Sequence, residues 1–486
     1  MGHRSIQPAG HEASPTETSP LLKSVSGSAD VSGDCVASDT RGTWSHEARV
    51  IASYSAPLIV TFLLQYSVDA SSLIAAGRLG KVELGAVSLA NMSAAITCFA
   101  PIQGLATSLD TLCAQAYGSG NKHLVGLYCQ RMTLFLLCHL VPMAVLWFYS
   151  EPILARLVAD AETARLAASY LRVLTCAMPG YVLFETGKRF LQAQGLFRAT
   201  TYMLLVAAPC HVLLVWLLVG RLGFIGAPVA IAVTRTFIPV LFFVWVRFVH
   251  GSACRVALSR RAFANWWTMI RLSVPGMVMM EAEYLAFELM IIASSRFGTD
   301  HLAAQSILSA IATISFQVPF SVSIASSTRV ASLVGAGTVD AAKVAAKVAF
   351  AATCITGCLN VVVYTALRLQ LPFIFTDDPA VAALASQVLP LLSTTTFLEG
   401  LAVTAHGLLR GIGRQSIGGP VTISAYYLVA LPVSGGLAFG LGWKLQGLLL
   451  GLTIGLVGVS LVEYTYLCLT DWRKTATEAA ARNAAG

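Results

Sequence analysis

Charged residues are scarce in this sequence. Lys, Arg, Asp and Glu make up 12% of its 486 residues, which is about half of the roughly 25% that is usual in soluble domains. Hydrophobic residues account for 56%, and the mean hydropathy is +0.71. A soluble fold of this size needs far more charge to cover its surface. The composition therefore excludes a soluble protein and predicts one that faces lipid.

Other absences exclude further classes. The net charge is +8, but no five like charges follow one another, which argues against nucleic-acid binding. The 11 Cys form no C-x-x-C pair, so neither a disulfide framework nor a zinc site is expected. The sequence has no phosphate-binding loop, no H-E-x-x-H and no G-x-S-x-G. We therefore predict no enzyme, no ATP-driven pump, no metal and no cofactor.

Long apolar runs dominate what is present. A run of about 20 apolar residues matches the hydrocarbon thickness of a bilayer. The predicted spans lie near 49–73, 83–108, 124–148, 165–184, 200–220, 225–249, 267–294, 302–323, 344–366, 382–406, 419–440 and 446–469. These runs predict an all-α polytopic membrane protein with twelve transmembrane helices and both termini on one side.

The two halves of the chain resemble each other. Ser55-x-Pro57 recurs 218 residues later as Ser273-x-Pro275, and Arg78-x-Gly80 recurs at the same offset as Arg296-x-Gly298. Further matches are Leu84-x-Ala86-x-Ser88 with Leu302-x-Ala304-x-Ser306, Gly118-x-Gly120 with Gly335-x-Gly337, Leu191 with Leu409, and Gly195 with Gly413. Each unit holds six spans, so the repeat predicts two parallel six-helix lobes related by a pseudo-twofold axis along the membrane normal.

This repeat and the composition define the expected domains. They are a disordered tail (1–46), an N-lobe (47–250), a linker (251–265), a C-lobe (266–472) and a C-terminal tail (473–486). One set of alternate loops holds 13 Lys and Arg, among them Lys188, Arg189, Arg329 and Arg410, against 8 in the other set. The positive-inside rule places the richer set and both termini in the cytoplasm.

Carboxylates within the spans are the most informative residues, because an unpaired charge in the membrane is costly. The candidates are Asp69, Glu281, Glu283, Glu288 and Glu399. At about 100° per residue, Glu281 and Glu288 share one face, and Glu283 lies about 140° from Glu288. A straight helix therefore does not point all three inward.

Other polar residues are predicted to have structural roles. Asp110, Glu185 and Glu463 lie near span ends, where we expect solvated or snorkelling carboxylates. His139, His211 and His406 lie on separate spans, and we expect satisfied polar contacts rather than metal ligands. The stretch 17–22 (ETSPLL) resembles an acidic dileucine sorting signal. The expected location is therefore the plasma membrane or the vacuolar membrane.

Seven segments carry a resemblance to a known family. They are LQY (64–66), GRLGKVEL (77–84), LDTLCAQAYG (109–118), RFLQAQ (189–194), STRV (327–330), LRGIGRQ (409–415) and AYY (425–427). In this order they resemble the multidrug and toxic compound extrusion (MATE) transporters of the eukaryotic, fungal branch. The chain departs from the pattern where Arg78 replaces the usual His. In EYLAFE (283–288), both acids of the family's E-W-W-x-[FY]-E element remain, but both Trp are lost.

The resemblance implies a secondary antiporter that exports organic cations and xenobiotics in exchange for protons by alternating access. It assigns proton and cation binding to Glu283, Glu288 and Glu399, where eukaryotic members carry functional acids. Asp69 falls where bacterial members have an Asp involved in coupling. The residues supply a reason, since a carboxylate in a poorly hydrated cavity holds a cation when ionised and releases it when protonated.

The remaining expectations concern the cavity and the partners. Its lining would offer hydrogen bonds and cation–π faces from Gln65, Tyr66, Tyr284, Phe287, Gln305 and Tyr426. We expect small organic cations, protons rather than Na⁺, and the lipid bilayer as partners, and a monomer. Two alternatives stay open: a flippase for lipid-linked substrates, which would want a basic cavity, and a membrane protein that does not transport.

Overall fold

The computed structural model describes residues 43–158 and 160–485, and within these ranges the chain is helical with no strand. Ten stretches are long and apolar enough to cross a membrane. One of them, 197–248, contains two helices joined by a turn at η3 (Gly223–Ile225). Another helix of 28 residues carries three Glu and spans a comparable length. The twelve transmembrane helices predicted from the sequence are therefore confirmed.

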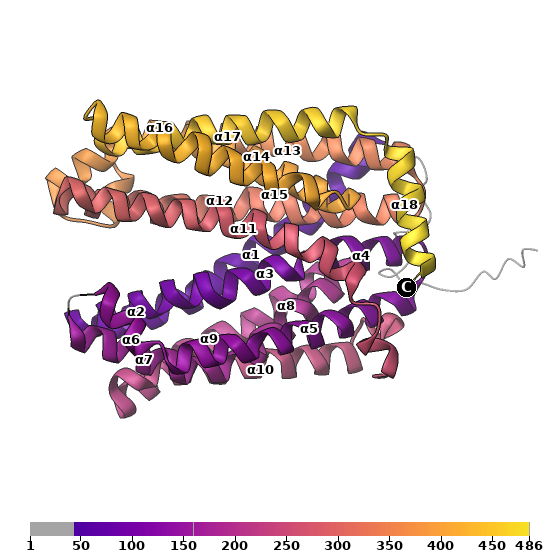
Figure 1. Cartoon of the computed structure of the whole chain (residues 1–486), viewed down its shortest axis with the longest axis horizontal. Helices are drawn as coiled ribbons and strands as arrows, with labels where there is room; N and C mark the ends of the chain where they lie inside the picture. The colour runs from indigo at the N-terminus through magenta and orange to yellow at the C-terminus, as the bar shows by residue number, and fades with distance from the viewer. Residues whose placement is uncertain (1–42, 159, 486) are drawn as a thin grey trace, which may run out of the picture. The chain divides into compact units, whose positions relative to one another are not determined.

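The N-lobe contains the first six spans (Figure 1). They are α1 (Trp44–Gly77), the chain of helices α2 (Lys81–Ala94), η1 (Ala95–Phe99), α3 (Ala100–Ala106) and α4 (Ser108–Gly118), then α5 (Lys122–Phe148), the pair α7 (Ala161–Leu174) and α8 (Met178–Ala193), α9 (Phe197–Leu222) and α10 (Gly226–Phe248). The short α6 (Glu151–Leu157) follows α5.

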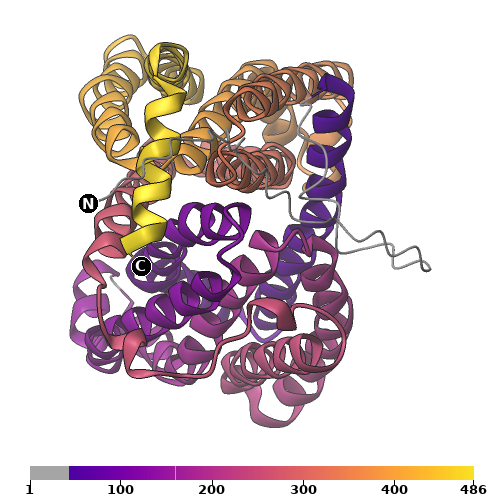
Figure 2. The same cartoon turned by 90° about the vertical axis from the view of Figure 1, so that its right-hand side faces the viewer.

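The C-lobe contains the other six spans. They are α11 (Trp267–Ser294), α12 (Thr299–Gly335), α13 (Val339–Ala366), α14 (Pro379–Ile412), the chain of helices α15 (Gln415–Ile423), η8 (Ser424–Ala430), α16 (Leu431–Gly435) and η9 (Gly436–Gly440), and then α17 (Lys444–Leu469). A further helix, α18 (Trp472–Ala485), lies across the ends of the others (Figure 2). We call the end of the bundle at which α18 lies the terminal end.

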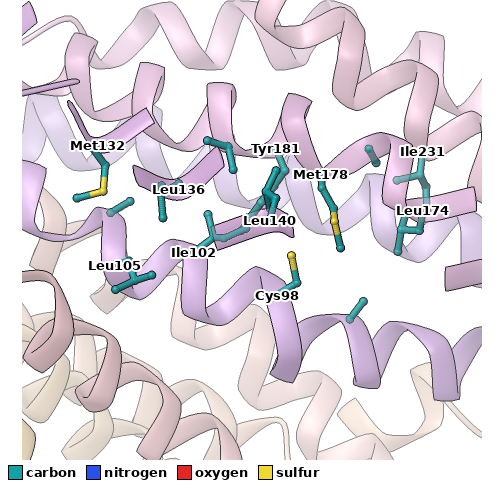
Figure 3. Close-up of a cluster of buried hydrophobic side chains, with 14 of the residues drawn as sticks. Cys98, Ile102, Leu105, Met132, Leu136, Leu140, Leu174, Met178, Tyr181 and Ile231 are labelled. Carbon is teal, nitrogen blue, oxygen red and sulfur yellow. The ribbon is translucent and has the colours of Figure 1, made fainter. Parts of the chain in front are cut away.

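Each lobe has its own apolar core. In the N-lobe, Ile102 and Leu105 of α3 face Met132 and Leu136 of α5, and α8 adds Met178 (Figure 3). A separate cluster in the C-lobe is built from α11, α12, α14 and α17. The outward faces are apolar as well: Leu213, Trp216 and Phe243 are well exposed. Such faces suit a lipid environment, where apolar groups need no burial in protein.

The predicted internal repeat appears as a reciprocal contact between the lobes. A Cβ atom on Gly118 would collide with the carbonyl oxygen of Ser332, and one on Gly335 would collide with the carbonyl oxygen of Gln115. Each partner lies three residues before the opposite glycine, as expected when a pseudo-twofold axis passes between α4 and α12. Only glycine lets the two backbones approach this closely.

The expected N-terminal tail and linker contain ordered structure at two points, the first turn of α1 and Cys254. Residues 1–42 and the dileucine-like stretch lie outside the described residues, but Trp44–His46 form the first turn of α1 rather than part of a disordered tail. This turn is held because Glu47 is buried and pairs with Arg329 of α12 at 2.7 Å. In the linker, Cys254 packs against α5, and burial raises the pKa of its thiol to about 11.

Four basic residues that the sequence assigned to loops lie on buried helix ends. Each is at most 5% exposed; they are Lys188, Arg189, Arg329 and Arg410. The helices continue past their apolar runs because these side chains find acidic partners inside the protein. When these four residues are left out, one set of loops holds nine Lys and Arg and the other set holds eight. This difference is too small to orient the chain in the membrane by itself. Arg49, Arg473 and Lys474 are exposed at the terminal end.

Candidate functional site

Two cavities lie between the helices, and each contains predicted site residues. The C-lobe cavity has a volume of about 260 Å³ and is lined mainly by α11, α12 and α14. The N-lobe cavity has about 310 Å³ and is lined mainly by α1, α8, α10 and α12. They share a wall, formed by Tyr284, Thr313, Phe316, Gln317 and Phe320. The predicted single cavity is therefore divided in two.

Three acids line the C-lobe cavity: Glu283 and Glu288 from α11, and Glu399 from α14. Glu283 and Glu288 both reach it although they lie about 140° apart around α11, because the cavity wall covers a wide arc that also includes Tyr284 and Phe287. Glu281 lies just outside this arc, and its buried Oε1 has no hydrogen-bond partner within 43–158 and 160–485. As the helical geometry predicts, not all three acids of α11 face inward.

The C-lobe acids have few compensating partners. Tyr426 donates a hydrogen bond from Oη to Glu283 Oε1 at 3.3 Å. Within the described ranges, Glu288 and Glu399 form no ion pair with a basic side chain. Glu399 is nevertheless only 7% exposed. The C-lobe cavity is thus acidic, with Arg410 and His406 as the basic groups on its wall.

The predicted cavity residues are distributed between the two sites. Phe287 and Gln305 line the C-lobe cavity, Gln65 and Tyr66 line the N-lobe cavity, and Tyr284 lines both. Tyr426 is not on either lining. It is buried behind Glu283, where its hydroxyl hydrogen-bonds the carboxylate rather than facing the cavity.

In the N-lobe cavity, Asp69 faces a basic residue. Arg235 of α10 approaches Asp69 Oδ1 with Nη2 at 3.5 Å, and its guanidinium lies 4.7 Å from the ring centres of Phe99 and Tyr181. Such cation–π contacts hold a guanidinium in an apolar setting. The sequence reading missed Arg235, although a lone Arg in the middle of an apolar span is itself a signal.

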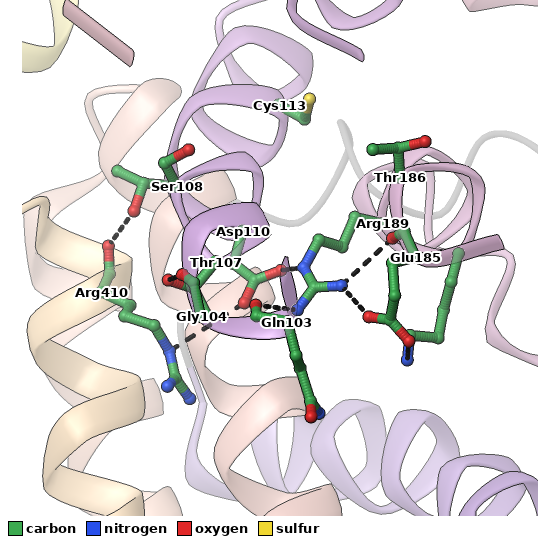
Figure 4. Close-up of polar contacts among 12 residues, drawn as sticks. Gln103, Gly104, Thr107, Ser108, Asp110, Cys113, Glu185, Thr186, Arg189 and Arg410 are labelled. Atoms are coloured by element: carbon green, nitrogen blue, oxygen red, sulfur yellow. Dashed lines mark hydrogen bonds and ion pairs between the residues drawn. The ribbon is translucent and has the colours of Figure 1, made fainter. Parts of the chain in front are cut away.

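A buried ionic network connects the two lobes near the terminal end (Figure 4). Arg189 contacts Asp110 at 3.2 Å and Glu185 at 2.5 Å, and Lys188 pairs with the same Glu185 at 2.8 Å. Arg410 of the C-lobe reaches Asp110 at 3.9 Å. Charges that are mutually paired and hydrogen-bonded tolerate burial.

The structure corrects three expectations about acids near the span ends. Solvated or snorkelling carboxylates are predicted at Asp110, Glu185 and Glu463, but these residues are 7%, 1% and 0% exposed. Asp110 and Glu185 are buried because Arg189 and Lys188 compensate them. Glu463 is buried because His406 lies 3.2 Å away. Hydropathy detects where apolar runs end, but it does not detect such partners.

Further contacts close the lobes against each other at the terminal end. Thr111 of α4 donates a hydrogen bond to the carbonyl of Arg410 at 2.6 Å, and Gln115 donates to that of Gly411 at 3.0 Å. From α18, Arg482 donates to Gln115 at 3.0 Å, and Glu478 accepts from Arg414 at 2.9 Å. The helix α18 therefore joins α4 of the N-lobe to the C-lobe. Both cavities lie on the far side of these contacts.

Known proteins resemble this chain over most of its length. The MatE family model matches residues 57–217 and 275–434. The Saccharomyces cerevisiae transporter YDR338C is 40% identical over 441 residues, which are 90% of this chain, and the chain spans 63% of that protein's length. Multidrug and toxin extrusion protein 2 of Mus musculus is 30% identical over 440 residues, covering 90% of this chain and 77% of that protein.

Solved structures agree with these sequence matches. The crystal structure of the eukaryotic MATE transporter AtDTX14 superimposes with a TM-score of 0.85 at 28% identity, over 90% of this chain and 99% of the other. The match includes both lobes, so the fold is the two-lobe, twelve-helix fold of that transporter. The sequence motifs, the family model and the fold agree, and the chain belongs to the MatE family of multidrug and toxic compound extrusion transporters.

Proposed function

We propose that this transporter is a proton-coupled antiporter that exports organic cations through the C-lobe cavity. The observation that carries the proposal is the concentration of Glu283, Glu288 and Glu399 on one cavity wall without an equal number of basic groups. A cation entering this cavity compensates buried negative charge. Protonation of the same carboxylates removes that charge and releases the cation.

The lining suits an organic rather than a hydrated inorganic cation. Tyr284, Phe287 and Phe316 offer aromatic faces, and Met280 and Met290 offer flexible apolar surface. A volume of about 260 Å³ is just below the range of roughly 300–1,000 Å³ typical of small-molecule pockets, which favours a small substrate. A Na⁺ ion, in contrast, is coordinated by several oxygen ligands that converge on one point. We therefore propose that the proton is the coupling ion.

A proton gradient can supply the free energy for export through the C-lobe cavity. A gradient of one pH unit is worth about 1.4 kcal/mol per proton. Exchange then requires that the cavity open alternately to the two sides of the membrane, which means breaking the contacts between α4, α14 and α18 at the terminal end. We propose that the terminal end is cytoplasmic, and that the membrane is the plasma membrane or the vacuolar membrane.

The alternative of a lipid-linked flippase has less support. Phosphate recognition requires Arg or Lys side chains that are not already paired with acids. At the N-lobe cavity, Arg235 faces Asp69 and Lys188 faces Glu185. The C-lobe cavity is acidic and would repel a phosphate. No feature of the described residues favours a non-transporting role over transport.

Transport by the purified full chain in proteoliposomes tests the proposal. We expect radiolabelled tetraphenylphosphonium to move against its gradient when a pH difference is imposed in the absence of sodium. A matched experiment imposes a sodium gradient at equal pH and is expected to drive no transport. Transport driven by sodium alone would overturn the proton assignment. Absence of transport across a panel of organic cations, with phospholipid scrambling instead, would favour the flippase.

A further inference from the structure

A buried histidine and a buried glutamate form a pair directly behind the C-lobe cavity. His406 of α14 lines the cavity, and its Nε2 lies 3.2 Å from Oε1 of Glu463 on α17. Thr422 of α15 lies 3.3 Å from the same ring nitrogen. The exposed fractions of His406 and Glu463 are 3% and 0%. The pair therefore has no contact with solvent except through the cavity.

Glu463 depends on His406 for compensation. Neither carboxylate oxygen of Glu463 accepts a well-formed hydrogen bond from the described residues, and both oxygens are buried. Gly418 packs near the carboxylate, and Met279 fills the adjacent space, so polar groups do not replace the missing partners. An ionised carboxylate in such a place is costly unless a proton or a cation accompanies it.

We propose that His406 and Glu463 together form a second proton-binding site of the transporter, which exchanges its proton with the C-lobe cavity. This inference rests on the proposed antiport. With one proton shared between imidazole and carboxylate the pair is neutral, as imidazolium with carboxylate or as imidazole with carboxylic acid. Without that proton the pair carries one negative charge. In a medium of low dielectric constant, the favoured protonation state of the pair is the one that brings the total charge of the pair and its neighbours closest to zero.

The neighbouring charges decide when the proton leaves. The groups with electrostatic influence on the pair are Glu283 from α11, Arg410 from α14, Tyr426 from η8, and Tyr464 from α17. When the cavity is empty, ionised Glu283 favours retention of the proton. When an organic cation occupies the cavity, its positive charge favours the deprotonated pair. Cation binding therefore expels a proton, and this coupling is the one that antiport requires.

The position of the pair gives the proton a path. His406 follows Glu399 by seven residues on α14, so it lies about 10 Å nearer the terminal end. The ring edges the cavity, whereas Glu463 lies behind it. A proton released from the imidazole thus enters the cavity without crossing lipid. The pair also lies one turn before Arg410, which contacts Asp110 of the N-lobe.

Proton release on cation binding tests the site. Purified protein in weakly buffered detergent solution is mixed with tetraphenylphosphonium, and released protons are counted with a pH indicator. We expect Glu463→Gln to release roughly one proton fewer per bound cation than the wild type. Glutamine keeps the volume of the side chain and an oxygen beside His406, so the fold should persist. Glu281→Gln, a half-buried acid outside both cavities, is the matched control and should release as many protons as the wild type.

A second variant and a second readout make the outcome decisive. His406→Gln should lower proton release similarly, because it removes one of the two groups that share the proton. In infrared difference spectra recorded through a pH titration, a carboxyl band present in wild type should be lost in Glu463→Gln. Unchanged proton release in both variants, together with an unchanged titration, would overturn the proposal. If the wild type binds no organic cation, the proposed function fails, while the infrared titration still decides whether the pair binds a proton.

Discussion

Both cavities contain carboxylates, but the basic residues that neighbour these carboxylates differ between the two cavities. In the N-lobe cavity, Asp69 faces Arg235, and Glu185 is held by Lys188 and Arg189. In the C-lobe cavity, Glu288 and Glu399 have no such partner among the described residues, and Glu283 accepts only from a tyrosine. The charge of a paired acid is already compensated, so a bound cation adds little electrostatic stabilisation. On the proposed function, the partners of the acids, rather than the number of acids, are what make the C-lobe cavity the cation site.

The largest effect is expected from removing the C-lobe acids. Glu283→Gln and Glu399→Gln should each lower the initial rate of pH-driven tetraphenylphosphonium transport at least about tenfold, since a buried charge that pairs with the cation is lost. Glutamine keeps the volume, so expression and elution from a sizing column should not change. Glu281→Gln is the control in the same helix. Wild-type rates in both site variants would remove the C-lobe cavity from the mechanism.

A smaller effect is expected from Tyr426→Phe. The substitution removes the hydroxyl that donates to Glu283 at 3.3 Å and keeps the buried ring. Because this long bond orients the carboxylate, we expect the KM for the cation to rise about three- to fivefold. Initial rates over a range of substrate concentrations measure this change. A KM equal to that of the wild type would mean that Glu283 does not need the tyrosine to hold its orientation.

Arg235→Gln should make the N-lobe resemble the C-lobe. Without the guanidinium, Asp69 loses its basic neighbour, and the N-lobe cavity becomes a weak cation site. Calorimetry should then detect additional tetraphenylphosphonium binding, and the apparent KM should change by about two- to threefold. The double variant with Asp69→Asn is the matched control and should lose the additional binding. If the extra binding persists in the double variant, Asp69 is not its cause.

The smallest effect is expected from Asp69→Asn alone. The Asp69 side chain is 56% exposed and faces Arg235 at 3.5 Å, so its charge contributes little that is not already compensated. We expect the rate of pH-driven exchange to stay within about twofold of the wild type. A variant that binds the cation but fails to exchange it for protons would show instead that the N-lobe carries the coupling step.

Residue type and position in the sequence identified the acids that line the two cavities. A carboxylate in an apolar run is costly, so Asp69, Glu283, Glu288 and Glu399 were identifiable without coordinates. Their separation into two cavities was not, because the dividing wall is made by Tyr284 and by residues of α12 far away in sequence. Arg235 was overlooked for a simpler reason: it interrupts an otherwise apolar span, and span-finding averages over it.

The sequence by itself determined the membrane class, the twelve spans and the parallel repeat, because hydropathy and recurring motifs follow directly from the order of residues along the chain. The tertiary structure alone decided which charges are compensated. Glu463 and His406 are 57 residues apart, and Asp110 and Arg410 are 300 apart, yet each pair meets inside the protein. Charge compensation depends on distances of a few ångströms between side chains of different helices, and no local pattern encodes those distances.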